Sequence, residues 1–197
     1  MTHAGIFLDR DGTINEEVDF LSSPENLHLL PRSAEAIHEF NALGFKVFIV
    51  TNQSGIARGR FTEKQLHDIH EALLSRLAEH NAHIDAIYYC PHHPDGSEPQ
   101  FRTDCDCRKP QPGMILKAVR EFSIDLPRSF VVGDRLIDIQ MGNAVGVPAI
   151  LVLTGYGKKE LSLCQHHNAK IAYIAADLFE AAQFIKRGVH QQQPSSL

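Results

Sequence analysis

Short apolar runs alternate with segments of helical periodicity along most of the chain, and this alternation restricts the fold more than any other feature. The apolar runs lie at residues 6–8, 47–50, 84–89, 130–132 and 149–153. Strands that alternate with helices are typical of βαβ units, in which the strands lie parallel in one sheet. The sequence therefore predicts an α/β fold built on a parallel sheet.

The segment at residues 62–80 has the clearest helical pattern. Its apolar residues recur at the period of 3.6 and form one stripe, made by Leu66, Ile69, Leu73, Leu74 and Leu77. Thr62 and Gln65 have the spacing of a capping box, which predicts that the helix begins there. Similar patterns predict further helices at residues 33–43, 113–122, 137–145 and 178–186.

The length of 197 residues suits one domain, which we expect over residues 1–187, followed by a polar tail over residues 188–197. The composition, 43% apolar and 22% charged, is that of a soluble globular protein without a membrane span. The N-terminal sequence lacks a signal-peptide pattern, so we expect a cytoplasmic protein. A net charge of -5 argues against a nucleic-acid surface, and a monomer is the default expectation.

Two carboxylates directly follow the first apolar run, in Asp9-Arg10-Asp11-Gly12-Thr13. Ligands of open α/β sheets bind beyond the carboxyl ends of the strands, so Asp9 and Asp11 indicate a site. Because residues i and i+2 of a strand start on the same side, both carboxylates can converge on one cation or one phosphate. Taken alone, the motif is equally typical of a solvated Asp-rich turn.

The segment from Cys90 to Pro112 interrupts the alternation, because it is poor in apolar residues and rich in proline, histidine, cysteine and charge. A loop of this size needs a function or a cross-link that holds it in place. Within residues 90–107 we expect a structural zinc site, because zinc favours a closed tetrahedron of Cys and His. The expected ligands are Cys90, His92, Cys105 and Cys107. Two alternatives stay open, namely His93 in place of His92 and free thiols in place of zinc.

Three further polar segments are expected near the same sheet edge. Residues 51–55 follow the second run, and their hydroxyls, amides and backbone N–H groups suit phosphate oxygens. Arg108 and Lys109 follow the zinc loop, where cations can balance the charge of a phosphoryl group. Asp134 follows the fourth run and can share a hard cation with Asp9 and Asp11, while Asp138 is expected to orient Lys109 or the metal shell. Each segment alone would indicate no more than a polar turn or a surface pair.

The order D-x-D-G-T, T-N, K-P and G-D-x-x-x-D over residues 9–138 resembles the four motifs of the haloacid dehalogenase (HAD) superfamily of phosphohydrolases. The resemblance implies a three-layer, Rossmann-like fold in which Asp9 is the nucleophile and Asp11 the general acid and base. It implies that Thr51 and Lys109 stabilise the phosphoryl group. Magnesium would be bound by Asp9, the backbone carbonyl of Asp11, and Asp134.

Longer strings narrow the resemblance. T-N-Q-S-G-I-A-R-G at residues 51–59, C-P-H-H-P at 90–94 and C-D-C-R-K-P-Q-P-G-M at 105–114 are similar to the D-glycero-D-manno-heptose-1,7-bisphosphate 7-phosphatase family. This family implies a magnesium-dependent, zinc-containing phosphatase that removes the 7-phosphate of a small phosphorylated sugar, for the heptose of bacterial lipopolysaccharide or related glycans. The implied substrate-binding residues are Glu17, Val18, Asp19, Phe20, Asn52, Gln53, Ser54, Arg108 and Arg135.

This sequence departs from the family pattern at two places. The string at residues 17–20 differs from the aromatic-containing string of some members, which leaves the fine substrate contacts open. Arg135 stands where a lysine is familiar, so a cation is retained although Arg and Lys are not equivalent.

Other functions are compatible with parts of the pattern. Histidinol-phosphate phosphatase, or another small-molecule HAD phosphatase, shares the motifs, and the first of these also has a Cys/His zinc loop. Arginines at positions 58, 60, 108 and 135 favour a substrate with two phosphates over a cationic amino alcohol. A zinc-stapled binding module is the non-enzyme alternative. A phosphotransferase or mutase would need a larger cap to exclude water, and no cap of that size fits between residues 13 and 51 or between residues 54 and 84.

Overall fold

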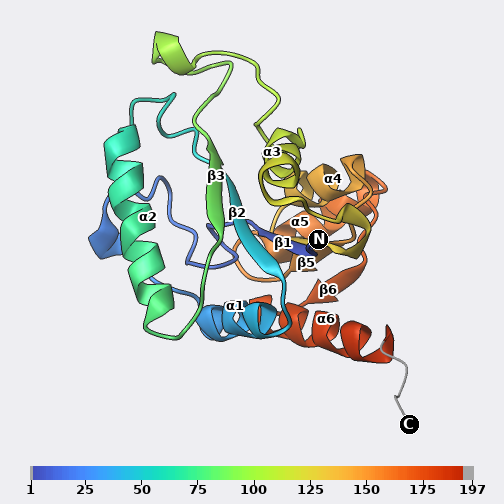
Figure 1. The fold of residues 1–197 in the computed structure, drawn as a ribbon. Coiled ribbons are helices and arrows are strands. Elements are labelled where there is room, and N and C mark those ends of the chain that lie inside the picture. Colours follow the sequence, from blue (N-terminus) through green and yellow to red (C-terminus); the bar gives the residue numbers. More distant parts are fainter. Residues whose placement is uncertain (1, 193–197) are drawn as a thin grey trace.

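The computed structural model describes residues 2–192, whose strands form one sheet in the order β3-β2-β1-β4-β5-β6 (Figure 1). The strands are β1 (Gly5–Leu8), β2 (Lys46–Asn52), β3 (Ala86–Cys90), β4 (Phe130–Gly133), β5 (Ala149–Val152) and β6 (Tyr173–Ala175). All neighbouring strands are parallel. The prediction of a parallel α/β sheet is confirmed.

Helices cover both faces of the sheet and complete a three-layer arrangement. One face carries α1 (Ser33–Ala42), α2 (Glu63–Ala78) and α6 (Leu178–Gln192), and the other carries α3 (Gly113–Phe122), α4 (Leu136–Ala144) and α5 (Gly157–His166). Helices α1 and α6 lie side by side along the lower end of the molecule in Figure 1. Short 3-10 helices lie at Pro24–Asn26, Pro99–Phe101 and Leu126–Arg128.

Strand β1 is apolar throughout because both faces of the sheet are covered. Ile6 and Leu8 pack into the core on the α1 side, whereas Phe7 packs into the core on the α4 side. Phe7 stacks on Phe48 of β2, with ring centroids 5.3 Å apart. Burial of each such side chain stabilises the fold by about 1.5–3 kcal/mol. The strand that carries the first motif is therefore a rigid support for it.

Helix α2 begins as the capping box predicts. The Thr62 side chain accepts a hydrogen bond from the Gln65 backbone N–H, and the Gln65 side chain accepts one from the Thr62 backbone N–H. The buried face of the helix carries the predicted apolar stripe through Ile69 and Leu73. It also buries His70, a polar side chain whose neighbours are described below.

The elements in the last quarter of the chain differ from the prediction. Helix α5 and strand β6 were not predicted, because α5 buries only Gly157 and Cys164 and β6 is three residues long. Helix α6 continues to Gln192, and Val189 still packs against the core. The predicted helix end at 186 is therefore wrong, and α6 includes the first residues of the predicted tail at 188–197. Residues 193–197 of that tail lie outside the described residues.

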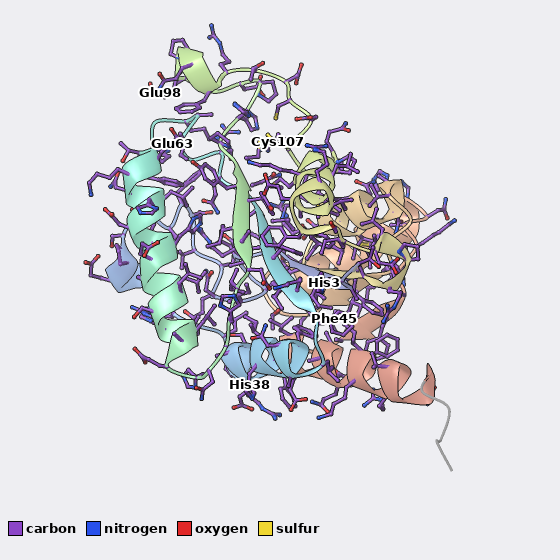
Figure 2. The ribbon with its side chains drawn as sticks, viewed as in Figure 1. His3, His38, Phe45, Glu63, Glu98 and Cys107 are labelled. Atoms are coloured by element: carbon purple, nitrogen blue, oxygen red, sulfur yellow. The ribbon has the colours of Figure 1, made fainter. Side chains whose placement is uncertain are left out.

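The strand order reverses at β1, since the chain builds β2 and β3 on one side of it and then crosses to β4 on the other. Such a switch point leaves a crevice at the carboxyl ends of β1 and β4, where ligands of open α/β sheets bind. Glu98 and Cys107 of the loop between β3 and α3 lie at the same end of the molecule as Glu63, the first residue of α2 (Figure 2). His38 and Phe45 lie at the opposite end.

The crevice is not covered by an inserted domain. In residues 2–192 the connections from β1 to α1 and from β2 to α2 hold no element beyond the 3-10 helix at Pro24–Asn26. Within the same residues, no helix is long and apolar enough to cross a membrane.

Candidate active site

A buried lysine lies between two carboxylates at the switch point. Lys109 Nζ is 2.7 Å from Asp9 Oδ1 and 2.7 Å from Asp138 Oδ1, and it donates to the Val50 carbonyl at 3.0 Å. Lys109 is 3% exposed. Burial disfavours its charged form, but Asp138 and Asp9 outweigh burial and raise the pKa of Lys109 above its usual value. Lys109 therefore stays a cation beside Asp9.

Asp138 lies in the first turn of α4, and the protein contacts both of its carboxylate oxygens. Its Oδ1 pairs with Lys109, and its Oδ2 accepts a hydrogen bond from the Arg135 backbone N–H at 3.0 Å. Asp138 is 1% exposed. The structure thus shows the contact with Lys109 that is expected if Asp138 orients this lysine.

Asp134, directly after β4, is fully buried and has one oxygen that no protein group satisfies. Its Oδ2 accepts a hydrogen bond from the Tyr156 backbone N–H at 2.7 Å, whereas Oδ1 has no partner in the described chain. Gly12 and Gly155, with φ of 79° and 51°, pass so close that a Cβ on either would collide with the Asp134 carboxylate. The chain therefore packs tightly around Asp134 and still leaves Oδ1 without a hydrogen bond.

The carboxylate cluster fits a hard divalent cation. The carboxylates of Asp9, Asp134 and Asp138 each offer an oxygen within 4.8 Å of the others. Burial, followed by the charges of Asp9 and Asp138, raises the pKa of Asp134 to about 8, and burial raises the pKa of Asp9 to about 6. A cation would relieve this repulsion and satisfy Asp134 Oδ1. Magnesium suits a site with one or two carboxylates that is completed by substrate phosphate.

The side chain of Asp11 lies outside this cluster. Its carboxylate accepts hydrogen bonds from the Arg10 guanidinium, from Asn15 Nδ2 at 2.9 Å and from Gln53 Nε2 at 3.0 Å. Burial alone would raise the pKa of Asp11, but the Arg10 charge and these hydrogen bonds hold it below its usual range. The Asp11 carboxylate is thus held in its ionised form.

A cavity of about 300 Å³ opens above these residues. It is lined by residues 17–21 and 51–55, and by Asp9, Asp11, Arg58, Phe61, Lys109, Arg135, Ile137 and Tyr156. Of the predicted substrate-binding residues, Arg108 alone does not line it. Arg108 Nη1 instead donates to the His92 carbonyl at 3.2 Å, which places this side chain against the loop between β3 and α3.

Two polar residues that line the cavity were not predicted as site residues from the sequence. Arg58 lines the cavity from the turn after β2, and the sequence had indicated it only as one of four arginines that suit a substrate with two phosphates. Tyr156 follows β5, which neighbours β4, so its strand-end position was a usable signal. The Arg135 guanidinium lies 5.1 Å from the Tyr156 ring centroid, and these two side chains line the cavity together.

The predicted zinc ligands converge in the loop between β3 and α3. Their ligating atoms all lie within 4.8 Å of one another, and they belong to Cys90, His92, Cys105 and Cys107. Cys105 Sγ is 3.5 Å from Cys90 Sγ and 3.3 Å from Cys107 Sγ, and His92 Nδ1 is 3.4 Å from Cys107 Sγ. Tetrahedral zinc with bonds of about 2.3 Å would hold its sulfurs about 3.8 Å apart. The donor set and spacing fit a structural zinc ion.

His93 is not a member of this cluster. Its Nδ1 accepts a hydrogen bond from the Asp95 backbone N–H at 3.0 Å, and its Nε2 lies 2.9 Å from Arg58 Nη2. The structure therefore selects His92 as the fourth donor. It also shows that the zinc loop contacts the turn that carries Arg58.

The backbone of Lys109 is tied to the end of β2. Asn52 Nδ2 donates to the Lys109 carbonyl at 3.2 Å, and the Lys109 N–H donates to Asn52 Oδ1 at 3.0 Å. Cys107 of the zinc cluster lies two residues before Lys109. The position of Lys109 therefore depends on the zinc loop on one side and on β2 on the other.

The fold and the site define a phosphohydrolase of the HAD type, and a family model described as HAD-hydrolase-like matches residues 106–181. The D-glycero-beta-D-manno-heptose-1,7-bisphosphate 7-phosphatase of Photorhabdus laumondii is 42% identical over 92% of this chain and 96% of its own length. The enzyme of the same name from Escherichia coli K12 is 47% identical over 76% of this chain and 79% of its own. The chain therefore belongs to the family of D-glycero-beta-D-manno-heptose-1,7-bisphosphate 7-phosphatases.

A solved structure shares both the fold and the family. The D,D-heptose 1.7-bisphosphate phosphatase from B. bronchiseptica, complexed with magnesium and phosphate, matches with a TM-score of 0.83 at 36% identity. The match covers 94% of this chain and 99% of that one.

Proposed function

We propose that the protein removes the 7-phosphate of D-glycero-D-manno-heptose 1,7-bisphosphate and releases heptose 1-phosphate and phosphate. The observation on which this proposal rests is the position of Asp9. Asp9 pairs with buried Lys109, lies close to Asp134 and lines a cavity that also carries cationic side chains. The names of the relatives support the substrate. The reaction would contribute to heptose synthesis for bacterial lipopolysaccharide or a related glycan.

In the first step Asp9 attacks the phosphorus of the 7-phosphate, and the bond from phosphorus to the sugar oxygen breaks. A carboxylate nucleophile divides a difficult hydrolysis into two easier steps through an aspartyl-phosphate. Lys109 holds the Asp9 carboxylate at 2.7 Å and keeps it oriented at the end of β1. Water then attacks the phosphorus and frees Asp9.

Asp11 is the group for the two proton transfers. It gives a proton to the departing sugar oxygen in the first step and takes one from the attacking water in the second. The ionised Asp11 of this structure is already in the form that the second step requires. The first step requires a protonated Asp11, so the negative charge of the bound substrate phosphate has to raise the pKa of Asp11 against the Arg10 charge and these hydrogen bonds.

Thr51 and Lys109 stabilise the transferred phosphoryl group. Thr51 Oγ1 accepts a hydrogen bond from Gln53 Nε2 at 2.9 Å, which leaves its own hydroxyl hydrogen for a phosphoryl oxygen. Lys109 supplies positive charge where transition-state charge is spread. Magnesium, held by Asp9, Asp134 and the Asp11 carbonyl, would supply charge neutralisation when bound. Arg58 and Arg135, which line the cavity, suit the second phosphate.

The test is phosphate release from three substrates under the same conditions. We expect heptose 1,7-bisphosphate to give the highest kcat/KM, well above fructose 1,6-bisphosphate and histidinol phosphate. Magnesium removal by a chelator is expected to stop the reaction, and magnesium to restore it. Higher kcat/KM for histidinol phosphate would contradict the substrate, and no phosphate release from any ester would favour a binding module.

Glu17 makes a pH-dependent contribution to substrate binding. Burial, followed by the charges of Asp11 and Asp9, raises the pKa of Glu17 to about 7. A raised pKa means that Glu17 is neutral at lower pH and ionises as the pH rises through about 7. The ionised side chain repels substrate phosphate, so wild-type KM is expected to rise about three- to tenfold between about pH 6 and about pH 8.

The variant Glu17→Gln should show a markedly smaller rise in KM over the same pH range. Glu16→Gln is the matched control, because Glu16 is exposed and does not line the cavity. The substrate titrates in the same way in the assays of the wild type and both variants, so a difference between their KM profiles does not come from the substrate. Identical pH profiles for the Glu17→Gln variant and the wild type would remove Glu17 from this role.

A further inference from the structure

Arg10 stands between the two aspartates of the first motif, yet its side chain is buried beneath Asp11. It is 1% exposed and does not line the cavity. Its Nε donates to Asp11 Oδ1 at 3.1 Å, and its Nη2 donates to Oδ1 at 2.9 Å and to Oδ2 at 2.7 Å. A buried guanidinium requires acceptors for its other N–H groups. Nη1 lies 3.2 Å from His70 Nε2.

The chemistry of this contact fixes the state of His70. A guanidinium only donates, so His70 Nε2 is the acceptor and the imidazole is neutral, with its proton on Nδ1. Burial, followed by the charge of Arg10, lowers the pKa of His70 to about 3. His70 is 7% exposed and belongs to the buried face of α2. It is therefore a fixed acceptor on a rigid helix.

We propose that His70 is a positioning residue for Asp11, which acts through Arg10. By accepting from Nη1, His70 fixes the plane of the guanidinium, and that plane fixes the Asp11 carboxylate. Asn15 and Gln53 also donate to Asp11, but each reaches a single oxygen, whereas Arg10 contacts both. This inference rests on the proposed function, because that function assigns the leaving-group proton to Asp11.

The contacts from His70 through Arg10 to Asp11 matter in the step that separates the alcohol from the phosphate. As the bond from phosphorus to the alcohol oxygen breaks, that oxygen takes the proton of Asp11, which becomes a carboxylate. A sugar alcohol is a poor leaving group and needs this proton, whereas p-nitrophenolate leaves without it. A misoriented Asp11 should therefore slow the hydrolysis of alkyl phosphates and spare that of aryl phosphates.

The test measures kcat/KM of His70→Leu and His70→Gln on heptose 1,7-bisphosphate and on p-nitrophenyl phosphate. This parameter covers the steps through alcohol release, so hydrolysis of the aspartyl-phosphate does not contribute. His70→Leu removes the acceptor, and we expect about a 10- to 100-fold loss on heptose bisphosphate and less than about threefold on p-nitrophenyl phosphate. His70→Gln keeps an acceptor near the position of Nε2 and is expected to retain most of the activity.

His67→Leu is the control, because His67 is an exposed histidine on the same helix and should leave both activities unchanged. Equal losses on both substrates, no loss in His70→Leu, or equal losses in the Leu and Gln variants would overturn the proposal. If His70→Leu does not fold, His70→Asn, whose amide is too short to reach Nη1, carries the same expectation. If the wild type does not hydrolyse heptose bisphosphate, the proposed substrate is wrong, and the comparison is made with its best alkyl phosphate.

Discussion

Replacement of Asp9 by Asn is expected to reduce kcat by roughly 10⁴-fold or more, the scale seen when a hydrolase loses its nucleophile. The amide keeps the size of the side chain but is neutral and a poor nucleophile, so no aspartyl-phosphate forms. The protein should remain folded, because Lys109 keeps Asp138 and the Val50 carbonyl as partners. Phosphate release under saturating substrate, together with circular dichroism, measures both effects.

The matched control is Asp68→Asn, which removes a carboxylate from the outer face of α2. The Asp68 side chain is 44% exposed and pairs only with Lys64 among the ion pairs of the described chain, so activity should not change. Near-wild-type turnover in Asp9→Asn would falsify the covalent mechanism. Labelled phosphate trapped on Asp9 after acid quenching of the wild type would support it directly.

Loss of the zinc site is expected to have the second large effect. Cys105→Ser removes one of four donors, and the loop between β3 and α3 has little apolar core of its own. We expect a loss of about 3–5 kcal/mol, which for a chain of this size lowers the melting temperature by roughly 10 °C. Activity should fall as well, because Lys109 lies two residues beyond Cys107.

Metal analysis and a thermal melt test this expectation. The wild type should contain about one equivalent of zinc, and Cys105→Ser much less. Cys164→Ala is the control, since Cys164 is a buried cysteine in the core between the sheet and α5 and is not part of the cluster. A zinc-free protein with full activity and an unchanged melting temperature would contradict the structural role.

The positions of the polar residues at strand ends could be predicted from the sequence because strand ends obey a simple rule. In a parallel sheet the carboxyl ends of β1, β2 and β4 meet at one edge, so Asp9, Thr51 and Asp134 had to approach one another. The zinc ligands could be predicted for a different reason, since one structural zinc ion requires four Cys and His side chains to lie around it.

Other features had no comparable signal. Arg10 and His70 are 60 residues apart and belong to no shared motif, so their contact follows only from the packing of α2. The family resemblance implied that Arg108 binds substrate. In the structure its Nη1 donates to the His92 carbonyl, because neighbouring side chains on an irregular loop need not face the same way, and substrate binding by Arg108 stays a prediction. Helix α5 buries only Gly157 and Cys164, and strand β6 is three residues long, so neither shows a clear periodicity.

The contacts of Lys109 determine when the active centre can form during synthesis and folding. Val50 and Asn52, which hold this lysine, lie 59 and 57 residues before it, and Asp138 lies in a helix that follows it. Contacts between distant residues form late, because closing long loops is entropically unfavourable. A nascent chain that ends before α4 therefore carries Asp9 and Asp11 without a working centre. In refolding, we expect phosphate release to lag behind the recovery of helical structure.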